Sequence, residues 1–260
     1  MQNELNIVGI QVDLVWENPV KNLAFFEKQI NTLPNNTDIV VLPEMFTTGF
    51  TMKPENITEK MDGISVTWMK RMAKKKDVAI VGSLVIKESN KYFNRLIFVH
   101  PSGKVETYNK RHSFTLAGED KVYTSGNEKL IVEYKGWKIC PLICYDLRFP
   151  VWARNTENYD LLIYMANWPV ARIKAWETLL KARAIENMSY TIGVNRTGKD
   201  ANNYEYSGSS LIIDYLGVEV SQLKTNEVGC IKATLKKDSQ NTIREKLGFL
   251  NDKDSFKINI

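Results

Sequence analysis

The sequence predicts an α/β protein in which two similar sheets lie face to face in one domain, each with helices on its outer side. The order strand, helix, strand, helix, strand, hairpin occurs twice along the 260 residues. Expected strands such as residues 38–42 are almost wholly apolar, which is typical of strands buried on both faces. Because no linker or low-complexity segment interrupts the chain, we expect residues 1–260 to form a single domain.

Apolar periodicity defines the first half of this pattern. Asn18 and Pro19 are typical of a helix cap and a first helical turn, and Leu23 and Phe26 follow at helical spacing. The lysine run 74–76 suits the C-terminal end of a helix, where cations complement the helix dipole. The expected elements are a strand at 5–11, a helix at 19–33, a strand at 38–42, a helix at 64–76, a strand at 78–86, and a hairpin of 95–100 with 105–108.

The second half repeats the order after another hairpin. Lys135 and Gly136 form the expected turn of that hairpin, and Pro150 suits the first turn of a helix because it lacks a backbone N–H. The expected elements are strands at 129–134 and 137–143, a helix at 151–156, a strand at 160–166, a helix at 173–188, a strand at 190–194, paired strands at 209–213 and 218–221, a late strand at 228–235, and a closing helix at 241–249.

Composition and charge exclude several classes of protein. No run of about eighteen apolar residues is present to cross a bilayer. The N-terminal residues lack the basic and apolar regions of a signal peptide, so we expect a cytoplasmic protein. The net charge of +5 comes from lysines spread along the chain, without the dense basic patch that nucleic-acid binding needs. We therefore expect a small-molecule partner, and neither nucleic acid nor membrane.

The cysteines indicate neither a disulfide framework nor a metal site. Cys140, Cys144 and Cys230 are too few and odd in number for a secreted disulfide scaffold. Cys140 and Cys144 are four residues apart, and neither a histidine nor a third cysteine lies nearby in the sequence. We therefore expect no bound metal.

Cys144 stands where an apolar strand ends and a helix is expected to begin. A side chain on such a corner projects free of the sheet, and the positive end of a following helix favours thiolate over thiol. Both effects would make Cys144 a better nucleophile. The alternative is that Cys144 is a small buried hydrophobe, as most free cysteines are.

Glu44, Lys110 and Cys144 each follow a different expected strand. The strand ends of open α/β sheets commonly hold ligands. A thiol beside an ammonium and a carboxylate is a workable nucleophile, because the carboxylate moves a proton while the lysine holds charge. The alternative for Glu44 is an exposed loop glutamate, which is the commoner environment of this residue type.

Three segments together resemble the nitrilase superfamily of carbon–nitrogen hydrolases, and the likeness spans nearly the whole chain. The segments are residues 41–50 (VLPEMFTTGF), 108–112 (YNKRH) and 142–150 (LICYDLRFP). Within the superfamily the chain is most similar to the ω-amidase branch, because of EMFTTGF and of residues 165–169 (MANWP).

This resemblance implies a four-layer αββα sandwich that is usually a homodimer and needs no cofactor. It implies that Glu44 is the general base and Cys144 the nucleophile of a thioester mechanism. Lys110, together with the backbone N–H of Tyr145, would stabilise the oxyanion. Glu119 matches a second family glutamate that orients the lysine and the substrate, and its alternative is a plain loop carboxylate.

The ω-amidase likeness also implies the substrates, which are short 2-oxo acids with a terminal amide, such as 2-oxoglutaramate and 2-oxosuccinamate. Their distal carboxylate needs a cation, and arginine is the natural partner. Arg148 and Arg172 are the candidates, with structural ion pairing as the alternative for each. The other expected substrate contacts are Phe46, Tyr145 and Trp168 as pocket walls and Asn167 as a polar contact, although large aromatics are more often plain core.

Rival interpretations stay open on the sequence alone. Another amidase of the superfamily would act on an N-carbamoyl compound, a deaminated peptide or a nitrile, since the pocket sets specificity. A cysteine–histidine hydrolase would use His112 as its base. A catalytically silent binding protein could share the fold. The helix at 173–188 has charged residues on its outer side that could face a second subunit.

Overall fold

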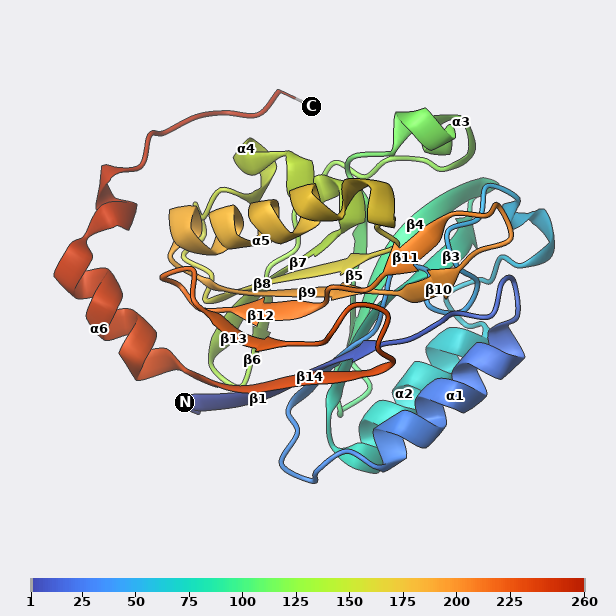
Figure 1. The fold of residues 1–260 in the computed structure, drawn as a ribbon, viewed down its shortest axis with the longest axis horizontal. Coiled ribbons are helices and arrows are strands. Elements are labelled where there is room, and N and C mark those ends of the chain that lie inside the picture. The colour runs from blue at the N-terminus through green and yellow to red at the C-terminus, as the bar shows by residue number, and fades with distance from the viewer. Residues whose placement is uncertain (1, 260) are drawn as a thin grey trace.

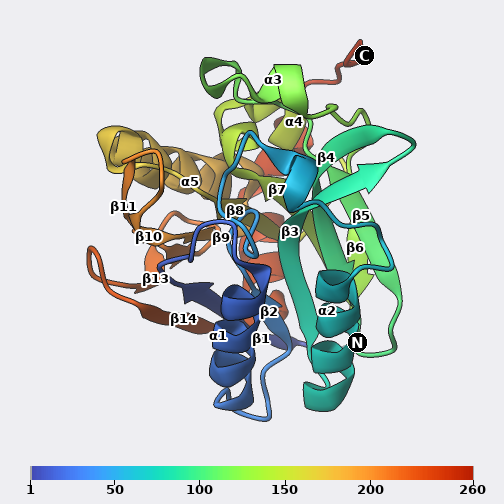
Figure 2. The ribbon, with the colours of Figure 1, turned by 90° about the vertical axis from the view of Figure 1, so that its right-hand side faces the viewer.

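The computed structural model describes residues 2–259 and confirms the expected α/β sandwich. Two six-stranded sheets pack against each other, with α1 (Pro19–Asn31) and α2 (Ile64–Lys76) outside the first sheet and α5 (Ile173–Asn187) outside the second (Figures 1 and 2). The four layers are therefore helix, sheet, sheet, helix. Within the described residues, every helix is too short or too polar to span a membrane.

The first sheet has the strand order β14-β1-β2-β3-β4-β5. Its centre is parallel, because β1 pairs with β2 and β2 with β3 in the same direction, whereas β4, β5 and β14 run antiparallel to their neighbours. The strands are β1 (Glu4–Gln11), β2 (Ile39–Val41), β3 (Ala79–Glu88), β4 (Lys91–Val99), β5 (Val105–Asn109) and β14 (Gly229–Lys236).

The second sheet has the order β13-β12-β9-β8-β7-β6 and repeats the same arrangement. Three parallel strands, β7, β8 and β9, are flanked by antiparallel β6 on one side and by β12 and β13 on the other. The doubled order expected from the sequence is thus present. The strands are β6 (Val132–Tyr134), β7 (Trp137–Ile143), β8 (Leu161–Ala166), β9 (Tyr190–Asn195), β12 (Leu211–Ile213) and β13 (Glu219–Gln222).

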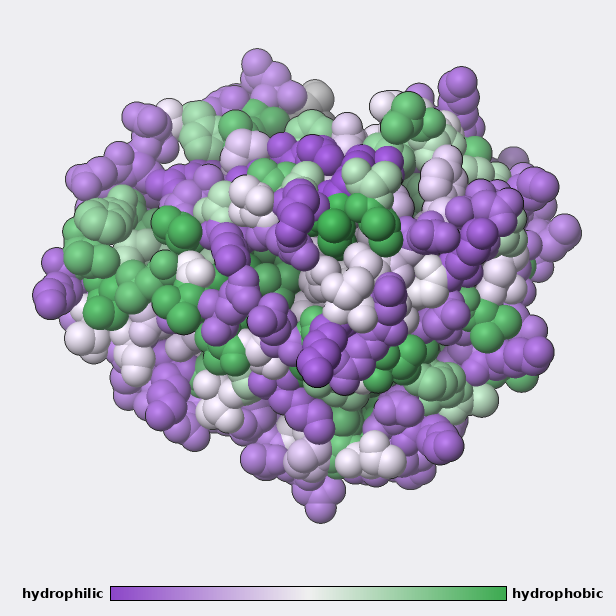
Figure 3. Space-filling view, in the orientation of Figure 1, coloured by the Kyte–Doolittle hydropathy of each residue, from purple (hydrophilic) through white to green (hydrophobic). Residues whose placement is uncertain are grey.

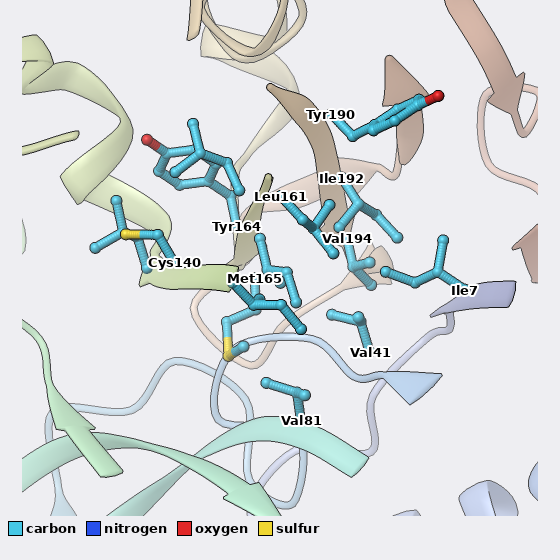
Figure 4. Close-up of a cluster of buried hydrophobic side chains, with 14 of the residues drawn as sticks. Ile7, Val41, Val81, Cys140, Leu161, Tyr164, Met165, Tyr190, Ile192 and Val194 are labelled. Atoms are coloured by element: carbon cyan, nitrogen blue, oxygen red, sulfur yellow. The ribbon is translucent and has the colours of Figure 1, made fainter. Parts of the chain in front are cut away.

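Alternation along the strands divides the apolar residues between two layers of core. Ile7, Val41 and Val81 point toward the second sheet, where Figure 4 shows them near Met165 and Val194. The adjacent positions face the opposite way, because successive side chains of a strand point to opposite faces. Those that join the core under α1 and α2 are Val8, Val40 and Ile80. Both faces of the sheet are covered, which explains its continuous apolar runs.

Several helices and strands begin or end at other residues than the sequence predicts. The helix expected at 151–156 is only α4 (Pro150–Ala153), because the backbone turns extended at Arg154. The closing helix α6 (Lys237–Leu247) begins directly where β14 ends, earlier than expected, since its first turn is polar and gave no apolar signal. β4 begins at Lys91 because Ser89 and Asn90, both at positive φ, form a tight turn from β3.

One hairpin was missing from the predicted elements. It consists of β10 (Thr197–Lys199) and β11 (Glu205–Ser207), which pair antiparallel outside both large sheets. Its strands have the sequences TGK and EYS, in which Tyr206 is the only large side chain with apolar surface, so the hairpin lacks the alternation that indicates a strand. The remaining short elements are α3 (Glu119–Val122) and the 3-10 turns η1 (Pro54–Asn56), η2 (Thr115–Ala117), η3 (Cys144–Arg148), η4 (Val170–Arg172) and η5 (Phe249–Asp252).

The packing of sheet against sheet predicts the effect of one substitution. Phe98 is fully buried on β4, and its ring lies 6.1 Å from that of Tyr134 on β6 of the other sheet. Phe98→Ala should lower the free energy of unfolding by about 3–5 kcal/mol, because it leaves a cavity between the sheets. Val20→Ala, at a position on α1 that is 70% exposed, should change it by less than about 0.5 kcal/mol. Denaturant unfolding measures the change in the free energy of unfolding for each variant. Equal changes in the two variants would contradict this packing.

Candidate active site

The thiol of Cys144 lies at the sharp corner that ends β7. Cys144 has a φ of +44°, a left-handed conformation that is strained for a residue with a side chain. The buried carboxylate of Asp146 fixes the corner, since it accepts the backbone N–H of Ile143 at 3.0 Å and that of His112 at 3.0 Å. It also accepts the hydroxyl of Tyr108 at 2.8 Å. The corner is thereby tied to β5, the strand that leads to Lys110.

Glu44 follows β2 and is fully buried. Its Oε2 accepts the backbone N–H of Asn167 at 2.9 Å, and its backbone carbonyl accepts the Asn167 side-chain amide at 2.6 Å. Asn167 follows β8 of the second sheet. These two bonds therefore join the ends of the central strands of the two sheets.

Lys110 follows β5 and places its ammonium between two carboxylates. Nζ lies 2.9 Å from Oε1 of Glu44, and 3.0 and 2.9 Å from the two oxygens of Glu119. Glu119, the first residue of α3, also accepts the backbone N–H of Phe114 at 2.6 Å. All three charged side chains are buried, so each depends on its partners for charge balance.

The electrostatics of the site follow from this burial. Burial alone would lower the pKa of Lys110, but Glu119 and Glu44 outweigh it and raise that pKa, so the lysine is an ammonium. Burial raises the pKa of Glu119, an effect that Lys110 opposes and Glu44 reinforces. Burial also raises the pKa of the Cys144 thiol well above its usual range, and Glu44 adds to the effect. Lys110 and the backbone N–H of Asn167 lower the pKa of Cys144, but they offset only part of this rise.

The expectation that this corner favours thiolate is therefore wrong for the free site. The segment after Cys144 is a single 3-10 stretch of five residues, Cys144–Arg148, which supplies only a weak positive end. Burial and the Glu44 carboxylate outweigh the effect of that positive end and raise the pKa of the thiol. The sulfur keeps its proton at neutral pH, so a nucleophilic role requires a base to remove it.

A cavity of about 650 Å³ opens onto Cys144 and Lys110. Aromatic rings form much of its wall, and β11 of the unpredicted hairpin contributes Tyr206. Of the expected substrate contacts, the structure places five on this wall: Tyr145, Arg148, Asn167, Trp168 and Arg172. Within residues 2–259, no group of three or more His, Cys, Asp or Glu side chains is arranged to hold a metal ion.

Neither cavity arginine is used in a structural ion pair. The guanidinium of Arg148 lies over the ring of Trp168 at 5.1 Å, and that of Arg172 lies over the ring of Phe114 at 5.0 Å. Among the described residues, neither has a carboxylate within 4.0 Å. Two guanidinium groups held by aromatic faces and free of counter-charges can bind an anion in the cavity.

Phe46 does not line this cavity, which corrects the expectation drawn from its place beside Glu44. It is fully buried under the helices of the first sheet, with its ring 5.5 Å from Phe26 and 6.1 Å from Trp68. Only Met45 lies between Phe46 and Glu44, and the chain turns there because Met45 has a φ of +44°. The side chain therefore enters the core while Glu44 faces Lys110.

Sequence reasoning missed three residues of the site. Asn94, on β4, donates to Glu44 at 2.8 Å and to Glu119 at 3.2 Å. Phe50 and Phe114 line the cavity, and Phe50 faces the Lys110 ammonium at 5.2 Å. The only available signal was for Asn94, a polar residue two positions before the apolar run at 96–99. The phenylalanines lie in loops, where no periodicity assigns a direction.

His112 is not among the residues that line the cavity. Its Nδ1 lies 2.8 Å from Asp146, and its ring stacks on Phe149 with centroids 3.7 Å apart. The imidazole thus helps to hold the corner at Cys144. The Glu44 carboxylate, by contrast, acts on the thiol, because it raises the pKa of Cys144.

Comparisons with known proteins relate the chain to amide-cleaving enzymes. The family model described as carbon-nitrogen hydrolase matches residues 7–244. The chain is 41% identical over 253 residues to the omega-amidase YafV of Yersinia enterocolitica, which covers 97% of this chain and 98% of that protein. It is 34% identical over 248 residues to the 2-oxoglutaramate amidase of Bacillus subtilis, and the match covers 94% of this chain and 95% of that protein.

Solved structures show the same architecture. XC1258 from Xanthomonas campestris, described as a CN-hydrolase superfamily protein with an arsenic adduct in the active site, superposes with a TM-score of 0.97. The two are 37% identical, and the match covers 99% of this chain and all of that one. Nit3 of Saccharomyces cerevisiae, at 22% identity and a TM-score of 0.84 with 95% of each chain covered, shares the fold.

The protonation state of Cys144 predicts how its alkylation depends on pH. Iodoacetamide reacts with thiolate, so labelling of Cys144 in the native protein should keep rising through pH 9, because its pKa is raised. Cys140 should stay unlabelled, since it is fully buried and burial raises its pKa to about 12. Peptide mapping by mass spectrometry measures each site. A plateau of Cys144 labelling near pH 7 would indicate a resting thiolate and contradict this description.

Proposed function

The chain belongs to the carbon-nitrogen hydrolase family and is an amidase, and from this premise we propose that it cleaves the terminal amide of short 2-oxo dicarboxylic acid monoamides. The substrates proposed are 2-oxoglutaramate and 2-oxosuccinamate. The products are the corresponding acid and ammonia. The single observation that carries this proposal is the pair of arginines without counter-charges in the cavity that contains the Cys144 thiol.

Acylation begins with the transfer of the Cys144 proton to Glu44. The sulfur attacks the amide carbonyl carbon, and the carbonyl oxygen becomes an anion bound by the Lys110 ammonium and the backbone N–H of Tyr145. Glu44 then returns the proton to the departing nitrogen. The C–N bond breaks, ammonia leaves, and the acyl group stays on sulfur as a thioester.

Deacylation uses the same groups with water as the nucleophile. Glu44 takes a proton from the water, whose oxygen attacks the thioester carbonyl. The oxyanion again lies against Lys110, and collapse of the intermediate breaks the C–S bond. The sulfur leaves with the proton held by Glu44, so the thiol is restored and a carboxylic acid is released. Glu119 contributes by holding Lys110 in place through both of its oxygens.

Substrate selection rests on charge and size. A 2-oxo acid has its carboxylate at the end opposite the amide, and a guanidinium can bind it with two parallel hydrogen bonds. Arg148 and Arg172 have the free hydrogen-bonding capacity for this role. Trp168, Tyr145 and Asn167 complete the wall near the thiol. The relatives named omega-amidase and 2-oxoglutaramate amidase support the same substrate class.

We also infer that the protein is a homodimer. Exposed apolar side chains gather over α6 and the turn from β12 to β13, at the left of Figure 3. A contiguous apolar patch of this kind is typical of a protein contact. The exposed residues on these elements and at the end of α5 are Ile185, Leu216, Val218, Leu247 and Phe249. The single domain and the cytoplasmic location stay predictions from the sequence.

The thioester scheme predicts that turnover requires Cys144. Cys144→Ala should lower kcat on 2-oxoglutaramate by about 10⁴-fold or more, with an unchanged thermal midpoint, because the nucleophile is lost. Cys140→Ala is the matched control, since this thiol lies on β7 four residues before Cys144 but is buried in the core, so the variant should keep its turnover. Ammonia release measures both. Residual turnover above about 10% in folded Cys144→Ala would reject the scheme, given the loss expected for a nucleophile.

The carboxylate role of the arginines predicts a substrate-dependent loss. One of the two arginines is expected to bind the carboxylate of the substrate. Its replacement by alanine should lower kcat/KM for 2-oxoglutaramate by roughly 10- to 100-fold, because a charge-assisted hydrogen bond disappears. The same variant should act on pentanamide, a neutral amide of equal chain length, as the unmodified protein does. Testing Arg148→Ala and Arg172→Ala separately identifies which guanidinium is responsible.

Arg71→Ala is the control, because this arginine pairs with Glu27 on the outer helices, away from the cavity. It should leave both substrates unaffected. If the unmodified protein prefers pentanamide, an N-carbamoyl compound or a nitrile to 2-oxoglutaramate, the proposed substrate class is wrong. If each arginine variant loses activity equally on charged and neutral amides, carboxylate binding is wrong.

A further inference from the structure

Asn94 binds the same two carboxylate oxygens as the Lys110 ammonium. Its Nδ2 lies 2.8 Å from Oε1 of Glu44 and 3.2 Å from Oε1 of Glu119. Nζ of Lys110 lies 2.9 and 3.0 Å from the same two atoms. The four atoms form a closed ring in which two donors alternate with two acceptors. Neither carboxylate can move without breaking a bond to both donors.

The ring leaves the two oxygens of Glu44 in different states. A carboxylate oxygen has two lone-pair positions, and both positions of Oε1 are filled by Lys110 and Asn94. Oε2 has one short bond, from the backbone N–H of Asn167 at 2.9 Å. The Asn167 side-chain amide lies 3.5 Å away, at the outer limit of a hydrogen bond. Oε2 therefore keeps capacity for a further proton.

The same backbone N–H of Asn167 also opposes part of the rise in the pKa of the Cys144 thiol. One donor thus acts on both the thiol and the oxygen of Glu44 that has capacity left. Oε2 is therefore the oxygen of Glu44 that is available to take the proton that leaves the sulfur. Oε1, on the opposite side of the carboxylate, is already saturated.

From this geometry we propose that Asn94 is a positioning residue that fixes the Glu44 carboxylate beside Glu119 and reserves Oε2 of Glu44 for the proton exchanged with Cys144. The inference rests on the proposed function, in which Glu44 is the base. Its physical content is that the Glu44 carboxylate raises the pKa of Glu119 in the same buried site. A donor that is shared between the two carboxylates opposes their repulsion, because it bonds to an oxygen of each.

The orientation of Asn94 follows from the two carboxylates that it faces. Its amide nitrogen, Nδ2, donates to an oxygen of each. Turning the amide over would bring Oδ1 against two carboxylate oxygens, which can only accept hydrogen bonds. The backbone of Asn94 is separate from this role, since its carbonyl accepts the N–H of Lys110 at 3.0 Å.

The test is the pH dependence of kcat/KM for 2-oxoglutaramate in Asn94→Leu, which keeps the volume but removes the donor. Without the shared donor the two neighbouring carboxylates repel each other more strongly, so the pair should take up a proton at higher pH and the acidic limb of the profile should move upward by about one pH unit. At pH values well above that limb, kcat/KM should stay within about 10-fold of the unmodified protein, because the nucleophile, base and lysine remain. Asn94→Ala should shift the limb in the same direction and serves if leucine prevents folding.

Asn155→Leu is the matched control. Asn155 is equally buried and donates through Nδ2 to two backbone carbonyls, those of Tyr159 and Asn187, and it touches none of the site residues. It should lower the thermal midpoint without moving the acidic limb. An acidic limb that is unchanged in both folded Asn94 variants would overturn the inference. Loss of turnover in Cys144→Ala together with that result would leave the proposed function standing, so the two failures are distinguishable.

Discussion

The ion cluster of Lys110, Glu44 and Glu119 is the constraint on which the rest of the site depends. Moving one such charge from water into a protein interior costs several kcal/mol, and a buried pair is tolerated only when further hydrogen bonds satisfy it. Here three buried charges share three contacts of 2.9 to 3.0 Å. Further acceptor positions take N–H groups from Asn94, Phe114 and Asn167. Both sheets therefore contribute to the cluster, since Asn94 is on β4 of the first sheet and Asn167 follows β8 of the second.

The doubled sheet explains how such a cluster can form from distant parts of the chain. The central strands β2 and β8 are followed by Glu44 and Asn167, and these two residues bond to each other across the sandwich. β7, next to β8, ends at Cys144, and β5 leads to Lys110. Packing the sheets face to face through Ile7, Val41 and their partners brings these ends to one place. The hydrophobic core between the sheets therefore fixes the geometry of the polar site at its edge.

The sequence predicted the fold and the charged residues of the site for a physical reason. Core strands and helices leave a period of two or 3.6 in the apolar residues, and the chemistry of Glu44, Lys110 and Cys144 stands out where those periods stop. Phe46 was misassigned because a turn at Met45 decides which way its ring points, and no periodicity extends into a turn. Asn94 was missed because its function depends on which strand lies opposite, and pairing is a property of the tertiary structure. The polar hairpin β10–β11 has no apolar period at all.

The largest physical revision concerns the thiol. From sequence, the corner at Cys144 suggested a thiolate stabilised by a helix end, which is a local effect of one element. In the structure the pKa of Cys144 is set by burial and by carboxylates that arrive from other strands, and these raise it. In the mechanism that we propose, a resting thiol beside the Glu44 carboxylate means that deprotonation and attack on the substrate are coupled, because the anionic charge can pass from sulfur to a carbonyl oxygen that Lys110 stabilises. The lysine would then be most useful at the moment of attack, and the two glutamates keep it charged.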